Sequence, residues 1–151
     1  MANEIHIDYA SGNTVYAVVR NGAGQVWYPA GQAFEDWGTG GHDADSYDIS
    51  LADKNGDRYV GDFDANIPAG HYTIQAFLQA GANPADTDDL VGGDEIIWRS
   101  GRRFTNDKIL ANKAVQNKST GAIDYYDDDG QTVILTHTPT DDESSITRTP
   151  S

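Results

Sequence analysis

The chain of 151 residues contains no cysteine and a single methionine. The absence of cysteine excludes disulfide bonds, thiolate metal sites and cysteine nucleophiles together. The stability of the fold must therefore come from packing within the chain or from its assembly with other chains.

Basic residues are scarce. Ten lysines and arginines stand against 24 aspartates and glutamates, which gives a formal net charge of −14. Nucleic-acid phosphates and anionic membrane surfaces both require clustered Lys and Arg on the protein. The charge balance therefore argues against nucleic acid and against a membrane surface as partners.

Long apolar runs are also missing. No stretch approaches the roughly 20 apolar residues of a helix that crosses a bilayer. The first ten residues, MANEIHIDYA, have neither the basic start nor the apolar stretch of a signal peptide. We therefore expect synthesis in a cytoplasm without classical export.

What the chain does contain is typical of a folded β-protein. Hydrophobic residues make up 38% and aromatic residues 10%, and 16 glycines accompany regular turn signals. The length fits one compact domain with a short appendage. Over residues 1–103, short β-segments separated by turns at roughly ten-residue spacing predict an antiparallel β-sandwich.

Several segments of this region predict individual strands. Residues 14–29 predict a hairpin around NGAG, and a further strand is expected over 47–51. The Gly, Pro, Asn and Asp content predicts a loop over 81–94, followed by a strand over 94–100. In residues 67–80 the alternation predicts a half-buried strand with these residues on one face: Tyr72, Ile74, Ala76 and Leu78.

The pattern changes after the sandwich. Residues 104–121 are interpreted as a linker that contains a short helix over about 105–118, because helix-forming residues follow a capping residue and Gly121 ends the run. Leu110 and Ala114 are spaced four apart and would share the apolar face of this helix.

Residues 122–151 predict a C-terminal β-hairpin followed by a third short strand. Asp129-Gly130 is a strong signal for a type I′ turn between the first two strands. A hairpin with so few apolar residues is marginal on its own. It needs a partner surface, either the sandwich of its own chain or another subunit.

The stretch DKNGDRYVGDFD, residues 53–64, superficially resembles a calcium loop. Asp53, Asn55 and Asp57 provide oxygen ligands at its first, third and fifth positions. However, the sixth position holds arginine where the EF-hand requires glycine, and the twelfth holds aspartate in place of the bidentate glutamate. An acidic hairpin turn at Asn55-Gly56 is the simpler interpretation.

The triad Asp127, Asp128 and Asp129 is a second candidate for a hard cation. Consecutive residues in a strand or tight turn point in different directions, so three neighbours rarely converge on one ion. We therefore interpret the triad as a turn. No cofactor is expected, and calcium is the ion that either acidic turn would suit.

Other charged loop residues give weaker signals. Asp86, Asp88 and Asp89 are interpreted as solvated charge. His42, with the aspartates beside it, lacks the spacing of a two-histidine metal motif.

Four aromatic residues could line a sugar-binding surface, although aromatic residues at this density in a sandwich more often form its core or a subunit interface: Trp27, Tyr28, Phe34 and Trp37. The first option makes a carbohydrate- or cell-surface-binding module, for example for a host surface glycan, the alternative function.

Motifs for enzyme chemistry are not found. The sequence contains no nucleophile elbow, phosphate-cradling loop or dinucleotide fingerprint. A hydrolase with an acid pair would need two carboxylates across a cleft, and 24 acidic residues make close pairs uninformative. We expect a protein that is not an enzyme.

Two segments carry a resemblance to a known group of proteins. The segment NTVYAVVRNGAGQVWYPAGQAFEDW (13–37), together with IPAGHYTIQAFLQAGANPADTDDLVGGDEIIW (67–98), resembles an immunoglobulin-like β-sandwich of tailed-phage and prophage virion proteins. Residues 112–151, with Y-DDDG, a strand and a T-R-x-P ending, look like the short tail segment at the end of many phage structural proteins.

The resemblance implies a virion location and a structural role. The protein would be a head, neck or tail decoration or fibre component that contacts neighbouring virion proteins, with a homotrimer as the expected assembly. Residues 122–150 would add strands to an intersubunit sheet, and Leu110 and Ala114 would lie at the same interface. Tyr125, Val133, Leu135 and Ile146 would face the partner, although a register slip of one residue would put Ile134 there instead.

Overall fold

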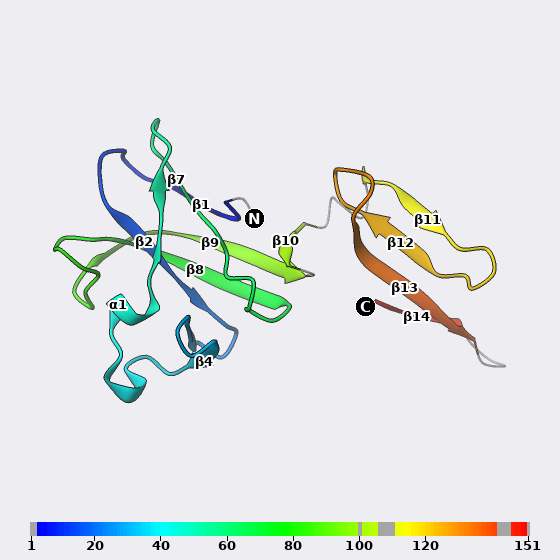
Figure 1. The fold of residues 1–151 in the computed structure, drawn as a ribbon, viewed down its shortest axis with the longest axis horizontal. Helices are drawn as coiled ribbons and strands as arrows, with labels where there is room; N and C mark the ends of the chain where they lie inside the picture. Colours follow the sequence, from blue (N-terminus) through cyan, green and yellow to red (C-terminus); the bar gives the residue numbers. More distant parts are fainter. Residues whose placement is uncertain (1–2, 100, 106–110, 142–145, 151) are drawn as a thin grey trace. The chain divides into compact units, whose positions relative to one another are not determined.

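In the computed structural model, the chain divides into two compact units, Met1–Arg103 and Phe104–Ser151. We call them the sandwich unit and the tail unit (Figure 1). The structure describes residues 3–99, 101–105, 111–141 and 146–150. The molecule is mainly β, and all strand pairings described below are antiparallel.

The sandwich unit is built from two sheets. The smaller has the order β1-β7-β6, with β1 at Ile5–Asp8, β7 at Arg58–Gly61 and β6 at Ala52–Asp53. The larger has the order β10-β9-β8-β2-β3-β4, and β5 also pairs with β2. Its strands are β10 (Arg102–Phe104), β9 (Asp89–Arg99), β8 (Gly70–Leu78), β2 (Val15–Arg20), β3 (Val26–Tyr28), β4 (Ala33–Glu35) and β5 (Ile49–Ser50).

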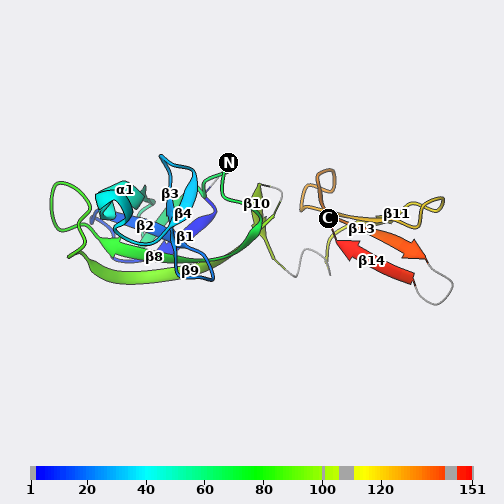
Figure 2. The ribbon, with the colours of Figure 1, turned by 90° about the horizontal axis from the view of Figure 1, so that it is seen from below.

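The central strands carry the predicted alternation. In β8, Tyr72, Ile74 and Ala76 are buried while His71 and Thr73 are exposed, which confirms the predicted alternation up to Ala76. A bulge then lies between Ala76 and Phe77, and Leu78 is only half-buried. Figure 2 shows β8 and β9 running side by side. In β2, five consecutive residues are buried because both faces of this strand are covered.

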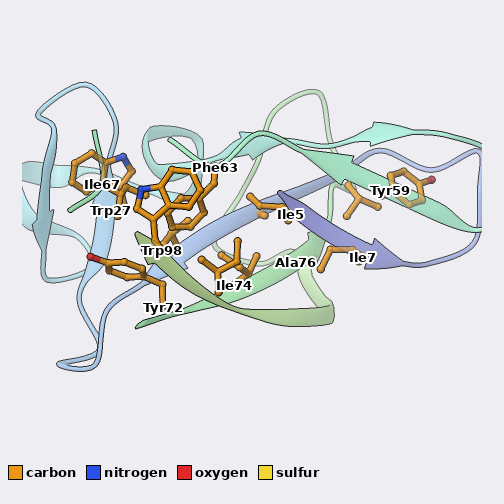
Figure 3. Close-up of a cluster of buried hydrophobic side chains, with 14 residues drawn as sticks. Ile5, Ile7, Trp27, Tyr59, Phe63, Ile67, Tyr72, Ile74, Ala76 and Trp98 are labelled. Atoms are coloured by element: carbon orange, nitrogen blue, oxygen red, sulfur yellow. The ribbon is translucent and has the colours of Figure 1, made fainter. Parts of the chain in front are cut away.

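One face of the larger sheet packs against the smaller sheet around a common core. Ile5 and Ile7 of β1 and Tyr59 of β7 contact the inward residues of β2, β8 and β9. Figure 3 shows Trp27, Phe63, Tyr72 and Trp98 at one end of this core and Tyr59 at the other. The Phe63 and Trp98 rings lie 4.6 Å apart, within the range of favourable aromatic contacts.

The other face of β2 is covered by a short irregular segment. A 3₁₀ turn at Thr39–Gly41 leads into the one-turn helix α1, Ala44–Tyr47, whose Ala44 and Tyr47 are buried against Tyr16 and Val18. The prediction of a strand over 47–51 is therefore wrong at its start. Among the described residues, no helix is long and apolar enough to span a bilayer.

The predicted loop over 81–94 is too long, because β9 begins at Asp89. Gly92 and Gly93, which contributed to the loop prediction, lie within β9. A Cβ atom on Gly93 would lie 2.8 Å from the carbonyl oxygen of Ile74, which is closer than such atoms approach. Glycine is thus required here by the close approach of β8.

The tail unit is one four-stranded sheet in the order β11-β12-β13-β14. Its strands are β11 (Ala114–Gln116), β12 (Ile123–Tyr126), β13 (Val133–Asp141) and β14 (Ile146–Pro150). The predicted helix is wrong over 114–116, because these residues form β11. Pairing of Ala114 with Tyr125 and a turn from Asn117 to Gly121 override the helical preference of the segment. Residues 106–110, which include Leu110, lie outside the described part of the chain.

Candidate functional site

The four aromatic residues predicted as a ligand surface lie on two different faces of the larger sheet. Trp27 is only 2% exposed, and its indole Nε1 donates a hydrogen bond to Asp64 at 2.9 Å. Phe34 packs edge-on against Trp27 with ring centres 5.1 Å apart. Both belong to the core, so they are not part of a ligand surface.

Tyr28 and Trp37 pack on the opposite face, against the cluster that contains Tyr16 and Tyr47. There Trp37 lines a pocket of about 280 Å³. We call this the Trp37 pocket, and its other lining residues come from β2, α1, β8 and the loop before β9: Tyr16, Arg20, Ala44, Phe77, Ala85 and Asp86.

Arg20 is the cation of the Trp37 pocket. Its Nη1 donates to the carbonyl oxygen of Gly24 at 2.9 Å, and its Nε donates to Gln75. The guanidinium carbon lies 5.0 Å from the centre of the Trp37 ring, which is a cation–π distance. Burial lowers the pKa of the Arg20 guanidinium, although arginine stays protonated in proteins.

Asp86 is the carboxylate that lines the Trp37 pocket. Its carboxylate accepts the backbone N–H of Ala44 at 2.9 Å and the indole N–H of Trp37 at 3.4 Å. These contacts explain why α1 starts where it does and how the Trp37 ring is oriented. Asp86 is exposed, as expected of a solvated loop charge, but its carboxylate also binds a partner 42 residues away in sequence.

The floor of the pocket is aromatic. The rings of Tyr16 and Phe77 are stacked, with centres 5.5 Å apart and planes 18° from parallel. The Tyr16 hydroxyl donates to the carbonyl oxygen of Ala85 at 3.3 Å, and burial, followed by the charge of Asp88, raises the pKa of this phenol. The pocket thus combines three rings, one cation and one carboxylate.

His42 pairs with Glu35, not with the aspartates that flank it in sequence. The distance from its Nδ1 to the Glu35 carboxylate is 2.6 Å, and the Tyr47 hydroxyl donates to the same oxygen at 2.8 Å. The hydrogen bond from His42 is the main cause of a lowered Glu35 pKa. These contacts fasten the segment before α1 to the end of β4.

The acidic turn at residues 53–57 uses its carboxylates to bind backbone. Asp53 accepts the N–H groups of Gly12 at 2.7 Å and Asn55 at 2.8 Å, and Asp57 accepts the N–H of Ser11 at 3.0 Å. In the described part of the chain, no group of three or more His, Cys, Asp or Glu side chains is placed to hold a metal ion.

The second acidic turn differs from the predicted type I′ geometry. Gly130 has φ of 65°, whereas Asp129 does not have a positive φ, so one of the two required residues is missing. The Asp129 carboxylate accepts the N–H groups of Gln131 and Thr132, both at 2.8 Å. Asp128 accepts the side-chain amide of Asn112 at 2.8 Å.

Apart from Leu110, which lies outside the described residues, the predicted interface residues lie on the strands of the tail sheet. Leu135 stands opposite Tyr125, Val133 stands opposite Tyr126, and a bulge separates the two pairs. Ile134 and Leu135 are 2% and 5% exposed, whereas Val133 is 41% exposed. The bulge therefore breaks the expected grouping of Val133 with Leu135. By backbone register, Ala114 lies opposite Tyr125 and Ile146 lies opposite Asp141.

Comparison with protein-family models, curated proteins and solved structures finds no match to this chain. Function must therefore be inferred from the contacts, burial and charge of its own residues.

Proposed function

We propose that the protein is a non-enzymatic structural component of a phage-like particle, a head, neck or tail decoration or fibre protein. In this proposal the sandwich unit is an immunoglobulin-like domain that contacts neighbouring virion proteins. The tail unit joins copies of the chain, with a homotrimer as the expected assembly.

The supporting observation is a pair of exposed aliphatic side chains in the tail sheet. Val115 and Val133 are each 41% exposed. The sheet has only four strands, and β11 and β14 form its edges. A small sheet of this kind gains stability when another chain covers its apolar side chains or pairs with an edge strand.

The net charge of −14 supports assembly through a restricted surface. Copies with this charge repel one another over most of their area. Apolar side chains offer an attractive contact that charge does not oppose directly, and a closed symmetric oligomer uses the same contact in every copy.

The proposal is tested by replacing Val133 with aspartate in the full chain and measuring the mass in solution by size-exclusion chromatography with light scattering. We expect the unmodified chain to be an oligomer and Val133→Asp to be a monomer. Leu90→Asp is the matched control, because Leu90 is 59% exposed but belongs to the sandwich unit, and it should leave the oligomer intact. A monomeric unmodified chain, or an oligomer that survives Val133→Asp, would contradict the proposal.

A further inference from the structure

We infer that the Trp37 pocket binds one ring of a neutral saccharide, a function separate from the assembly role proposed for the tail unit. The pocket lies wholly within the sandwich unit, between β2, α1, β8 and the loop before β9. Four of its seven lining residues carry chemistry that a sugar ring needs: Arg20, Trp37, Phe77 and Asp86.

The size of the pocket limits the ligand. Its volume of about 280 Å³ lies just below the roughly 300–1,000 Å³ range of ligand pockets. A single six-membered ring with its hydroxyl groups fits this space. A longer saccharide would place one ring in the pocket and its remaining rings on the surface.

The polar groups offer one donor side and one acceptor side. Among the described residues, the Nη2 group of Arg20 has no hydrogen-bond partner, and no carboxylate lies within ion-pair distance of the guanidinium. Asp86 supplies an exposed carboxylate, and within the described part of the chain the one hydrogen bond to its Oδ2 is a long one of 3.4 Å from Trp37. Since a sugar hydroxyl both donates and accepts, it can pair with either side chain.

The aromatic rings supply the apolar contact. Phe77 is half-buried and is held flat against Tyr16 by ring stacking. The C–H groups on one side of a pyranose ring carry partial positive charge, which favours packing on the negative face of an aromatic ring. Pockets that combine rings with a few fixed polar groups are typical of small-ligand sites.

The charge of the protein selects a neutral ligand. A net charge of −14 opposes the approach of an anionic saccharide, and one arginine does not reverse this field. A cationic ligand would meet Arg20 inside the pocket. A neutral hexose or N-acetylhexosamine avoids both penalties.

The inference is tested on the full chain by saturation-transfer NMR with methyl glycosides of neutral hexoses and N-acetylhexosamines. We expect transfer to at least one glycoside. Ala85→Trp should abolish it by filling the pocket, since Ala85 uses backbone groups for its hydrogen bonds. Arg20→Gln should weaken binding at least tenfold. Arg58→Gln, which removes an arginine paired with Asp8 on the smaller sheet, should leave it unchanged.

Several results would overturn the inference. One is a lack of transfer to every glycoside of the panel. Another is binding that Ala85→Trp and Arg20→Gln leave unchanged while circular dichroism shows that both variants fold. A third is binding of N-acetyltyrosine amide but no glycoside, which would assign the pocket to a protein side chain.

Discussion

At the scale of single residues, the tightest constraint lies where β9 passes β8. Gly92 and Gly93 are neighbours in β9, yet their surroundings differ. A Cβ atom on Gly93 would lie 2.8 Å from a backbone oxygen of Ile74, whereas one on Gly92 would lie 3.5 Å from a methyl group of Ile7. Backbone cannot move aside as a side chain can, so the two positions should respond differently to the same substitution.

We therefore expect Gly93→Ala to lower the free energy of unfolding by about 2 kcal/mol, the middle of the range for overpacking. Gly92→Ala should change it by less than about 1 kcal/mol, because its new contact is an ordinary one. Urea unfolding of both variants checks this. Equal destabilisation by the two substitutions would show that the close approach to Ile74 does not limit the sheet.

Two Gly-containing dipeptides show how far residue identity predicts a turn. Asn55-Gly56 has positive φ at both positions, 64° and 65°, as its sequence predicts. Asp129-Gly130 carries a similar signal, but the Asp129 carboxylate binds the N–H groups of the two residues after Gly130 and favours another turn. A side-chain bond of this kind competes with the backbone preference, and the dipeptide alone does not reveal it.

At the scale of elements, local patterns predict the strands that alternate and miss those set by distant partners. The alternation in β8 identifies its buried face correctly. The start of β9 is missed because Gly92 and Gly93 look like loop residues. Gly93 is in fact required by the close approach of the β8 backbone. The first N–H group of helix α1 binds Asp86, which is distant in sequence, and strand β11 forms by pairing with β12. Neither element can therefore be predicted from its own local sequence.

The candidate site shows the same division. The sequence singles out Trp37, because an aromatic residue is conspicuous in any pattern. It gives no sign that Arg20, Phe77 and Asp86 gather around Trp37, since these residues come from β2, β8 and a loop. Their contacts depend on how the strands are ordered in the sheet, which propensity and periodicity do not encode.

Asp53 connects two loops of the sandwich unit, so its titration should affect the stability of both. Hydrogen bonds from the backbone N–H groups of Gly12 and Asn55 lower the pKa of this carboxyl. A lowered folded-state pKa stabilises the fold above the unfolded value of about 3.9, and this contribution is lost as the pH falls through the folded pKa.

We expect Asp53→Asn to lose less stability than the unmodified chain between pH 7 and about pH 3, because the variant lacks this titration. Urea midpoints at the two pH values measure the difference. Asp89→Asn removes the same charge from another exposed residue and should keep the original pH dependence. An unchanged pH dependence in Asp53→Asn would contradict the role of Asp53.

At the scale of the whole molecule, the net charge of −14 is a cost that the fold carries at neutral pH. Close ion pairs such as Arg103–Asp94, at 2.6 Å, neutralise only a few of the acidic residues. The remaining carboxylates repel one another, and salt screens this repulsion over distances beyond about 10 Å at 0.1 M.

We therefore expect the melting temperature to rise by about 2–4 °C between 20 mM and 0.5 M NaCl, equivalent to roughly 1 kcal/mol of relieved repulsion. Calorimetry at pH 7 measures this shift, and the same series on Val133→Asp, which we expect to be monomeric, separates it from any effect of salt on assembly. A melting temperature that falls with added salt would mean that attractive ion pairs outweigh the repulsion.

The three tryptophans of the chain, Trp27, Trp37 and Trp98, all lie in the sandwich unit. Intrinsic tryptophan fluorescence is therefore blind to the tail unit, whereas far-ultraviolet circular dichroism records the strands of both units. A tail sheet that unfolds separately from the sandwich unit should therefore give a circular-dichroism transition without a counterpart in the fluorescence. Trp27 and Trp98 are buried in the core, so a change of emission when a ligand enters the pocket is expected to come from Trp37.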